Sequence, residues 1–362
     1  AYSRLAPGGF NQREVDVMNT FTQCLQAIQE RDPDVVVHAG DLFHVVRPSN
    51  ATIVHAFKAL SRFQNERGGK PFILIGGNHD TPRTAESGNI LALFGDIPGV
   101  YLNPRELSVY EIPELDLEVM AVPSFSLMAK ENVDLLPSRN RKHSLLTLHG
   151  MSYQALPDHS DFNVEETRHE RWTYVALGDY HSFQPYGRNV CYAGSTDFAS
   201  TNIWDELKQP KGWVWFETES GLELVPLQTR RVYDLPRIDA EGMSPEQVEA
   251  AMQANAMWTD EFPIVRQRIV NLHPSIRAKV DYRVLREISN RALNYQIHAI
   301  APARQGSAQP GQPATAMTLE RSWEEHVSAS DVPSTIDRAR LKDLGLELLR
   351  EVAETEAHPT EA

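Results

Sequence analysis

Residues 71–80 read PFILIGGNHD, and residues 35–41 read VVVHAGD. Each stretch is a short apolar run that ends in glycine and then in polar side chains. Short apolar runs bounded by turn residues predict buried strands. The segment between them, residues 51–67, has helical periodicity, which makes a strand–helix–strand unit of the α/β class. Ligands in such folds bind at the carboxyl ends of the strands, so we expect functional residues there.

Outside this unit, apolar periodicity predicts a preceding helix over residues 11–30. Further along, short strand-like segments recur at a spacing that suits a second sheet packed on the first. These segments cover residues 107–112, 117–122, 144–148, 174–177, 190–193, 213–217 and 222–226. Residues 157–170, rich in Asp, Glu and His, predict a long exposed loop. The expected fold is a two-sheet α/β sandwich flanked by helices.

The pattern changes again near residue 232. Alternating helix and strand signals over residues 232–303 predict a small α+β domain. Residues 304–316 are rich in Gln, Pro, Ala and Gly and predict a linker, and residues 317–362 predict a helical tail. Residues 1–231 would then form the main domain.

Composition limits the classes of protein. The chain has 362 residues, a formal net charge of −14 and two distant cysteines, Cys24 and Cys191. No apolar run is long enough to span a membrane, and no cysteine spacing predicts a disulfide framework or a zinc ribbon. We therefore expect a cytoplasmic protein with no membrane partner. The acidic charge argues against a generally basic nucleic-acid coat, although bound cations and a local basic rim can still attract nucleic acid to a cleft.

Four polar clusters follow predicted strands, and together they predict a metal site. They are Gly40-Asp41, Gly77-Asn78-His79-Asp80, His149-Gly150 and Gly178-Asp179-Tyr180-His181. Any one of these could be structural, but four in succession at strand ends are unusual. Carboxylate, amide and imidazole ligands suit manganese, iron or zinc, and two such ions can hold and activate a phosphate ester. A carboxylate such as Asp41 could bridge the two ions.

The order of these clusters resembles the calcineurin-like metallophosphoesterase superfamily. Within it, the run from His38 to His44 followed by Arg47-Pro48 resembles the SbcD-type exonuclease branch, which repairs DNA double-strand breaks. The run from Tyr192 to Thr196 also resembles that branch. The resemblance covers residues 11–205 closely and the rest in layout. It implies a metal-dependent phosphodiesterase that hydrolyses DNA with two divalent ions, most simply Mn²⁺, with Fe²⁺ or Zn²⁺ as alternatives.

The resemblance also implies roles for single residues. Asp41 would bridge the two ions, Asn78 and His149 would bind the second, and His181 the first. His79 would contact the phosphate and assist departure of the leaving group, and Asp80 would orient His79. These assignments make His79 and Asp80 the expected catalytic pair.

Two departures from the family pattern matter. Asp179 stands where the family's last motif has a histidine, and we interpret it as a metal ligand that tunes the site. The family's opening Asp-x-His is absent, and Ala1-Tyr2-Ser3 resembles the residues that come directly after that motif in the family. We therefore expect that the main domain lacks its first strand. We also expect that the sequence lacks its true start.

The resemblance further implies partners. DNA would contact Arg47 and Arg83, both weak candidates that could equally be solvated surface. The small domain would be a capping domain that helps to place DNA. The tail would dock an SbcC-like ATPase or fold back on its own domain, and a homodimer is expected by analogy. Two other interpretations stay open: a phosphodiesterase or phosphatase on small molecules, and a non-catalytic subunit that binds DNA or the partner.

Overall fold

The computed structural model describes residues 5–6, 9, 11–82, 88–129, 134–200, 202–302, 323–324, 326–328 and 337–357. These residues fall into two compact units, Ala1–Ala301 and Pro302–Ala362.

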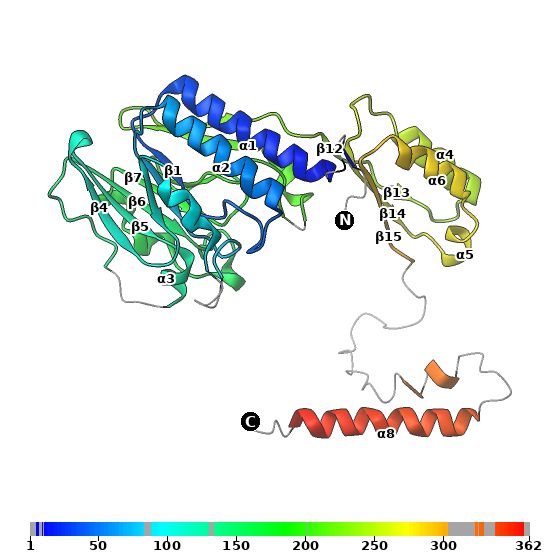
Figure 1. Cartoon of the computed structure of the whole chain (residues 1–362). Helices are drawn as coiled ribbons and strands as arrows, with labels where there is room; N and C mark the ends of the chain where they lie inside the picture. Colours follow the sequence, from blue (N-terminus) through cyan, green and yellow to red (C-terminus); the bar gives the residue numbers. More distant parts are fainter. Residues whose placement is uncertain are drawn as a thin grey trace. The chain divides into compact units, whose positions relative to one another are not determined.

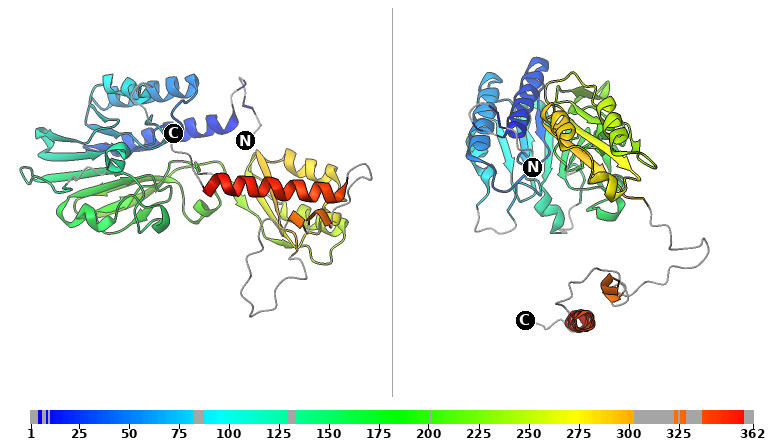
Figure 2. Two further views of the ribbon diagram at one scale, coloured as in Figure 1. Left: turned by 90° about the horizontal axis from the view of Figure 1, so that it is seen from below. Right: turned by 90° about the vertical axis from the view of Figure 1, so that its right-hand side faces the viewer.

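A parallel three-stranded sheet of order β1-β2-β3 forms one layer of the main domain. Two helices lie side by side along it, as Figures 1 and 2 show. Both begin at a capping side chain, because Asn11 accepts from the Arg13 amide and Ser49 from the Thr52 amide. The elements are α1 (Gln12–Arg31), β1 (Val36–His38), α2 (Asn50–Glu66), β2 (Phe72–Ile75) and β3 (Val100–Asn103).

A six-stranded mixed sheet of order β4-β5-β6-β7-β9-β8 forms the second layer. Its four central strands are parallel, and the two edge strands are antiparallel to their neighbours. A separate antiparallel hairpin comes after it in the chain. The strands are β4 (Ser108–Ile112), β5 (Leu117–Val122), β6 (His143–His149), β7 (Tyr174–Gly178), β8 (Gln184–Pro185) and β9 (Val190–Tyr192), then β10 (Gly212–Glu217) and β11 (Gly221–Pro226).

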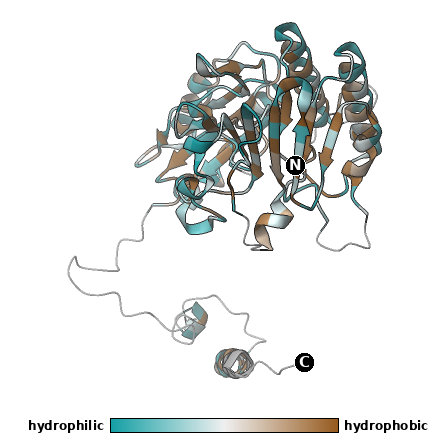
Figure 3. Cartoon of the chain, turned by 90° about the vertical axis from the view of Figure 1, so that its left-hand side faces the viewer, coloured by the Kyte–Doolittle hydropathy of each residue, from teal (hydrophilic) through white to brown (hydrophobic). Residues whose placement is uncertain are grey.

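The two sheets pack face to face through aliphatic side chains. Ile73 and Ile75 of β2 are completely buried against Val119 and Ala121 of β5. Figure 3 shows hydrophobic segments concentrated on the strands. On the other side of the first sheet, α1 and α2 cover a second cluster that includes Leu74. The predicted two-sheet α/β class is therefore confirmed, and the strand ends are held on a rigid base.

The segment from residue 157 to 171 differs from the prediction of an exposed loop. It forms three short 3₁₀ turns, Pro157–His159, Val164–Thr167 and His169–Arg171. Phe162, Val164 and the following Trp172 are buried against Leu146 and Leu148 of β6. The charged residues face outward between these apolar anchors, which is why composition alone predicted an exposed loop.

Residues from β12 onward build a small α+β layer with a core of its own. Helices α4 and α6 pack on a parallel sheet in which β14 pairs with β12, β13 and β15. Ile264 and Leu293 of this layer contact Ile203, which follows the last polar cluster of the main domain. The elements are β12 (Val232–Asp234), β13 (Ile238–Asp239), α4 (Pro245–Asn255), β14 (Ile264–Val270), α5 (Pro274–Arg277), α6 (Tyr282–Asn290) and β15 (Asn294–Ala299).

In the second unit, helix α8 (Arg338–Ala357) is the main described element. Trp323 lies against it, with its indole N–H donating to the Lys342 carbonyl at 3.0 Å. Leu344 and Leu348 are about half exposed on the same helix. No helix within the described residues is long and apolar enough to cross a membrane.

Both cysteines are buried in the main domain, Cys24 on α1 and Cys191 on β9. Burial raises the pKa of each thiol to about 12. They are free thiols, as the sequence predicted when it excluded a disulfide framework.

Candidate metal centre

Polar residues from both sheets meet where β1, β2, β6 and β7 end. His149 closes β6 and pairs in register with Gly178 at the end of β7. Asp41 follows β1, and Asn78 follows β2. Because both sheets direct the carboxyl ends of these strands to the same place, residues from four distant parts of the sequence become neighbours.

Glycines make this close approach feasible. A Cβ atom on Gly40 would lie 2.1 Å from His149 Nδ1, and one on Gly77 would lie 2.0 Å from Asp41 Oδ1. A Cβ on Gly178 would lie 1.8 Å from the Ala39 carbonyl oxygen. Gly40 also has φ = +95°, in the region that favours glycine. The glycines of these motifs are therefore required by packing.

Asp41, His149 and Asp179 form a cluster in which one ligand atom from each lies within 4.8 Å of the others. His149 Nε2 is 3.6 Å from Asp41 Oδ2 and 3.7 Å from Asp179 Oδ1. Asn78 Nδ2 reaches the same Asp179 oxygen at 3.4 Å. Four of the sequence-predicted ligands thus share one site.

The chemistry of His149 fits a metal ion. Its Nδ1 lies 2.7 Å from the Ala39 carbonyl, which can only accept, so Nδ1 carries the proton. In the neutral ring Nε2 then presents a lone pair, and this buried atom has no hydrogen-bond partner among the described residues. A lone pair facing two carboxylates is unfavourable unless a cation lies between them. The donor atoms of Asp41, His149 and Asp179 are therefore suited to bind a divalent metal ion.

Acidic groups are crowded around the cluster. Burial raises the pKa of Asp179, and the neighbouring His149 opposes this shift. Burial, reinforced by the Asp41 carboxylate, raises the pKa of Asp80 to about 6. Both shifts reflect negative charge held away from water, which a bound cation would stabilise.

Asp80, expected to orient His79, bonds the backbone of two loops. Its carboxylate accepts from the backbone amides of Gly77 at 2.8 Å and Leu42 at 2.7 Å. It therefore joins the β1 and β2 loops to each other. This fixes the loop that carries His79, so any orienting effect of Asp80 on His79 would act through the backbone.

His79 is instead positioned by His44, which sequence reasoning did not single out. The two rings stack with centroids 4.8 Å apart, and His79 Nδ1 lies 3.1 Å from the His44 carbonyl. The His79 amide donates to Asp41 Oδ1 at 2.9 Å. The ring is thereby held next to the cluster by the loop after β1.

Comparison with known proteins agrees with this geometry. A family model for the calcineurin-like phosphoesterases matches residues 15–192, the segment that supplies every residue of the Asp41–His149–Asp179 cluster. The chain carries a calcineurin-like phosphoesterase domain. The four polar clusters, from Gly40-Asp41 to Gly178-Asp179-Tyr180-His181, all lie within the matched segment.

Curated relatives of the phosphoesterase domain are named DNA double-strand break repair protein Mre11. The protein of Sulfurisphaera tokodaii is 28% identical over 194 residues, covering 51% of this chain and 49% of the relative. That of Saccharolobus solfataricus is 31% identical over 201 residues, covering 51% and 50%. That of Sulfolobus acidocaldarius is 27% identical over 300 residues, covering 79% and 77%. The chain spans about half of the length of the first two.

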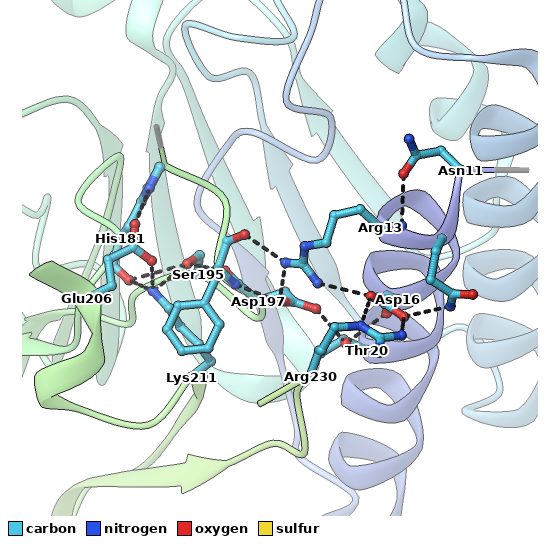
Figure 4. Close-up of polar contacts among 12 residues, drawn as sticks. Asn11, Arg13, Asp16, Thr20, His181, Ser195, Asp197, Glu206, Lys211 and Arg230 are labelled. Carbon is cyan, nitrogen blue, oxygen red and sulfur yellow. Dashed lines mark hydrogen bonds and ion pairs between the residues drawn. The ribbon is translucent and has the colours of Figure 1, made fainter. Parts of the chain in front are cut away.

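His181 lies two residues beyond Asp179 and does not belong to the Asp41–His149–Asp179 cluster. Its Nδ1 is 3.4 Å from Glu206 Oε1, and Lys211 lies against both residues (Figure 4). Burial alone would raise the pKa of Glu206, but hydrogen bonds from His181, Lys211 and Ser200 hold it at about 2. Sequence reasoning missed Glu206 and Lys211, because no motif spacing marks them.

Of the two arginines predicted to contact DNA, the structure describes one. Arg47 is exposed on the loop after β1, a few residues beyond His44. Arg83 lies outside the described residues. A cavity of about 1350 Å³ also borders the centre, lined by α1, β1 and β10 and reaching Asp41 and His181.

Proposed function

We propose that the phosphoesterase domain is a metal-dependent phosphodiesterase that hydrolyses DNA, as an SbcD-like exonuclease. The unpaired Nε2 of His149 between Asp41 and Asp179 is the observation that carries this proposal. A buried lone pair next to two carboxylates is the signature of a cation site. The relatives named for DNA double-strand break repair support DNA as the substrate.

Two divalent ions would be held by this chain's own side chains. Asp41 would bridge them, with Asn78, His149 and Asp179 completing one ion's ligands and His181 contributing to the other's. The carboxylate-rich ligand set favours Mn²⁺, and Fe²⁺ or Zn²⁺ suit the same imidazoles. When bound there, two divalent cations would lower the pKa of water and would neutralise charge on a phosphodiester.

His79 would act on the leaving group. The stacked His44 ring and the His44 carbonyl fix its orientation, with the Nδ1 proton on the carbonyl side. Its Nε2 is then the atom that can transfer a proton to the departing sugar oxygen. Asp80 would contribute by fixing the loop that carries this ring.

The remaining parts of the chain would serve the substrate and a partner. We propose that residues 232–303 are a capping domain that helps to place DNA, joined to the phosphoesterase domain of residues 1–231. Residues 304–316 would be a linker to the tail, residues 317–362. The half-exposed Leu344 and Leu348 of α8 support docking of this tail on an SbcC-like ATPase. We also propose that the chain forms a homodimer.

The test is manganese-dependent cleavage of linear duplex DNA by this chain, beside a His79→Ala variant and an aryl phosphodiester. Cleavage of DNA that disappears in the variant is the expected result. Hydrolysis of the aryl phosphodiester without cleavage of DNA would point to a small-molecule enzyme. Tight DNA binding without turnover of either substrate would identify a non-catalytic binding subunit.

A further inference from the structure

His181 is held from two directions by a buried ion pair. Its side chain is 26% exposed, whereas those of Glu206 and Lys211 are 7% and 2% exposed. Glu206 Oε1 faces His181 Nδ1 at 3.4 Å, and Glu206 Oε2 pairs with the Lys211 ammonium. Lys211 also donates to the His181 carbonyl at 2.7 Å and to Ser195 Oγ at 2.9 Å. The Lys211 ammonium thereby contacts three groups around His181, two of them through hydrogen bonds and Glu206 through an ion pair.

The ion pair determines which nitrogen of His181 can face a ligand. A carboxylate paired with a buried ammonium is ionised and can only accept a hydrogen bond. Glu206 therefore selects the tautomer in which Nδ1 carries the proton, and Nε2 is left as the lone pair. The Ala39 carbonyl does the same for His149.

The loop that carries these groups is fixed to α1. Ser195 donates from its amide to the His181 carbonyl at 3.0 Å. Two residues on, the Asp197 carboxylate accepts from Arg13 at 2.5 Å and Thr20 at 2.9 Å (Figure 4). The position of His181 therefore depends on one backbone bond and on side-chain bonds, whereas strand pairing fixes His149.

We propose that Glu206, kept ionised by Lys211, is a positioning residue that sets the tautomer and orientation of His181. The proposal rests on the proposed function for its consequence, because His181 is one of the expected metal ligands. The proton on His181 Nδ1, on which the proposal depends, can be measured in the metal-free chain. The competing explanation is a buried ion pair that stabilises the loop and has no effect on the imidazole.

The experiment compares Glu206→Gln with the double variant Glu206→Gln/Lys211→Met, which leaves no unpaired buried ammonium. Glu118→Gln is the matched control, since Glu118 is similarly buried and its carboxylate bonds only Ser138 among the described residues. Nitrogen-15 NMR of histidine-labelled, metal-free chain reports the His181 tautomer, assigned with His181→Gln. Manganese titration by calorimetry reports the number and affinity of bound ions, and circular dichroism reports folding.

We expect the Nδ1–H tautomer in the parent chain and a shift toward Nε2–H in both Glu206 variants. Manganese affinity for one of the two ions should fall about 10- to 100-fold, as for other partners of metal-bound histidines. Glu118→Gln should change neither the His181 tautomer nor the manganese affinity. Folded Glu206 variants with an unchanged His181 tautomer would overturn the proposal, whatever their thermal stability. A tautomer shift in a chain that binds no manganese would support the positioning role and contradict the proposed function instead.

Discussion

The His149 and His181 halves of the metal centre are built in different ways. His149 ends a paired strand, is 1% exposed and donates a hydrogen bond from Nδ1 to a backbone carbonyl. His181 lies in a loop and is 26% exposed, and its Nδ1 faces the carboxylate of Glu206, which pairs with Lys211. A backbone carbonyl is fixed by the fold, whereas a side-chain acceptor can be changed by one substitution. The fold therefore determines the first half, and the sequence of one loop determines the second.

The largest effect is expected from His149→Ala. Loss of a direct ligand should exceed the effect of losing a partner of that ligand, so manganese affinity at this half should fall by more than about 100-fold. Calorimetric titration with Mn²⁺ is the measurement. His143→Ala, at the other end of the same strand, is the control and should bind manganese like the parent chain. Equal affinities for both variants would show that His149 is not a ligand.

Gly40→Ala tests the rigidity of the His149 half without removing a ligand. The new Cβ would lie 2.1 Å from His149 Nδ1, so the ring must move from the Ala39 carbonyl. We expect manganese affinity to fall about 10- to 100-fold, as when an imidazole loses its orienting partner.

Gly68→Ala is the matched control for this change. Gly68 has φ = +65° with nothing within 4 Å of a new Cβ, so only backbone strain of about 1–2 kcal/mol is added. Thermal unfolding should register that strain while manganese binding stays at the parent value. Similar manganese affinities for the two variants would argue against a rigid His149 half.

The Asp179→His variant tests whether Asp179, which replaces the histidine of the family motif, determines which metal binds. Imidazole favours zinc more than a carboxylate does, and loss of the negative charge weakens binding of hard ions. We expect manganese affinity to fall and zinc affinity to rise, each by about 3- to 10-fold. Competition titration with both metals measures this, beside Asp158→His in the 157–171 segment. An unchanged preference would indicate that Asp179 contributes no metal bond.

The smallest effect is expected from Arg47→Ala, which touches neither half. If Arg47 contacts one phosphate, DNA affinity should fall uniformly across sequences and the salt slope should decrease by about 1. Fluorescence anisotropy at several salt concentrations gives both quantities. Arg62→Ala on the exposed face of α2 serves as the reference, and a salt slope equal to that reference would remove Arg47 from the DNA contacts.

Much of the first half could be predicted from sequence. The strand ends and the glycine-containing motifs located Asp41, Asn78, His149 and Asp179, because strand periodicity and close packing leave local signals. The residues that surround His181 in the second half could not be predicted in this way. Glu206 and Lys211 meet His181 only after the loop from residue 195 to 211 has folded, and no spacing rule links them. Asp80 shows the same limit, because its bonds to the Gly77 and Leu42 amides leave no signal in the spacing of residues.

Arg230 connects helix α1 to the small α+β layer. It pairs with Asp16 of α1 at 2.5 and 2.6 Å (Figure 4). It also donates to the carbonyls of Glu261 and Phe262. Asp16 lies on the same helix as Arg13 and Thr20, which hold Asp197. These contacts form a continuous polar connection from the α+β layer through α1 to the loop that carries His181, so a change in the orientation of that layer can be tested for an effect on this loop.

The two cysteines offer a practical route to observing such a change. Cys24 and Cys191 are buried, with thiol pKa values near 12, so neither presents a thiolate at neutral pH. Maleimide dyes should leave the parent chain unlabelled under native conditions. Cysteines introduced on the surface of α2 and of α6 would then be the reactive thiols, with no need to replace the natural ones. Energy transfer between two such dyes could follow the α+β layer in real time while metal and DNA are added.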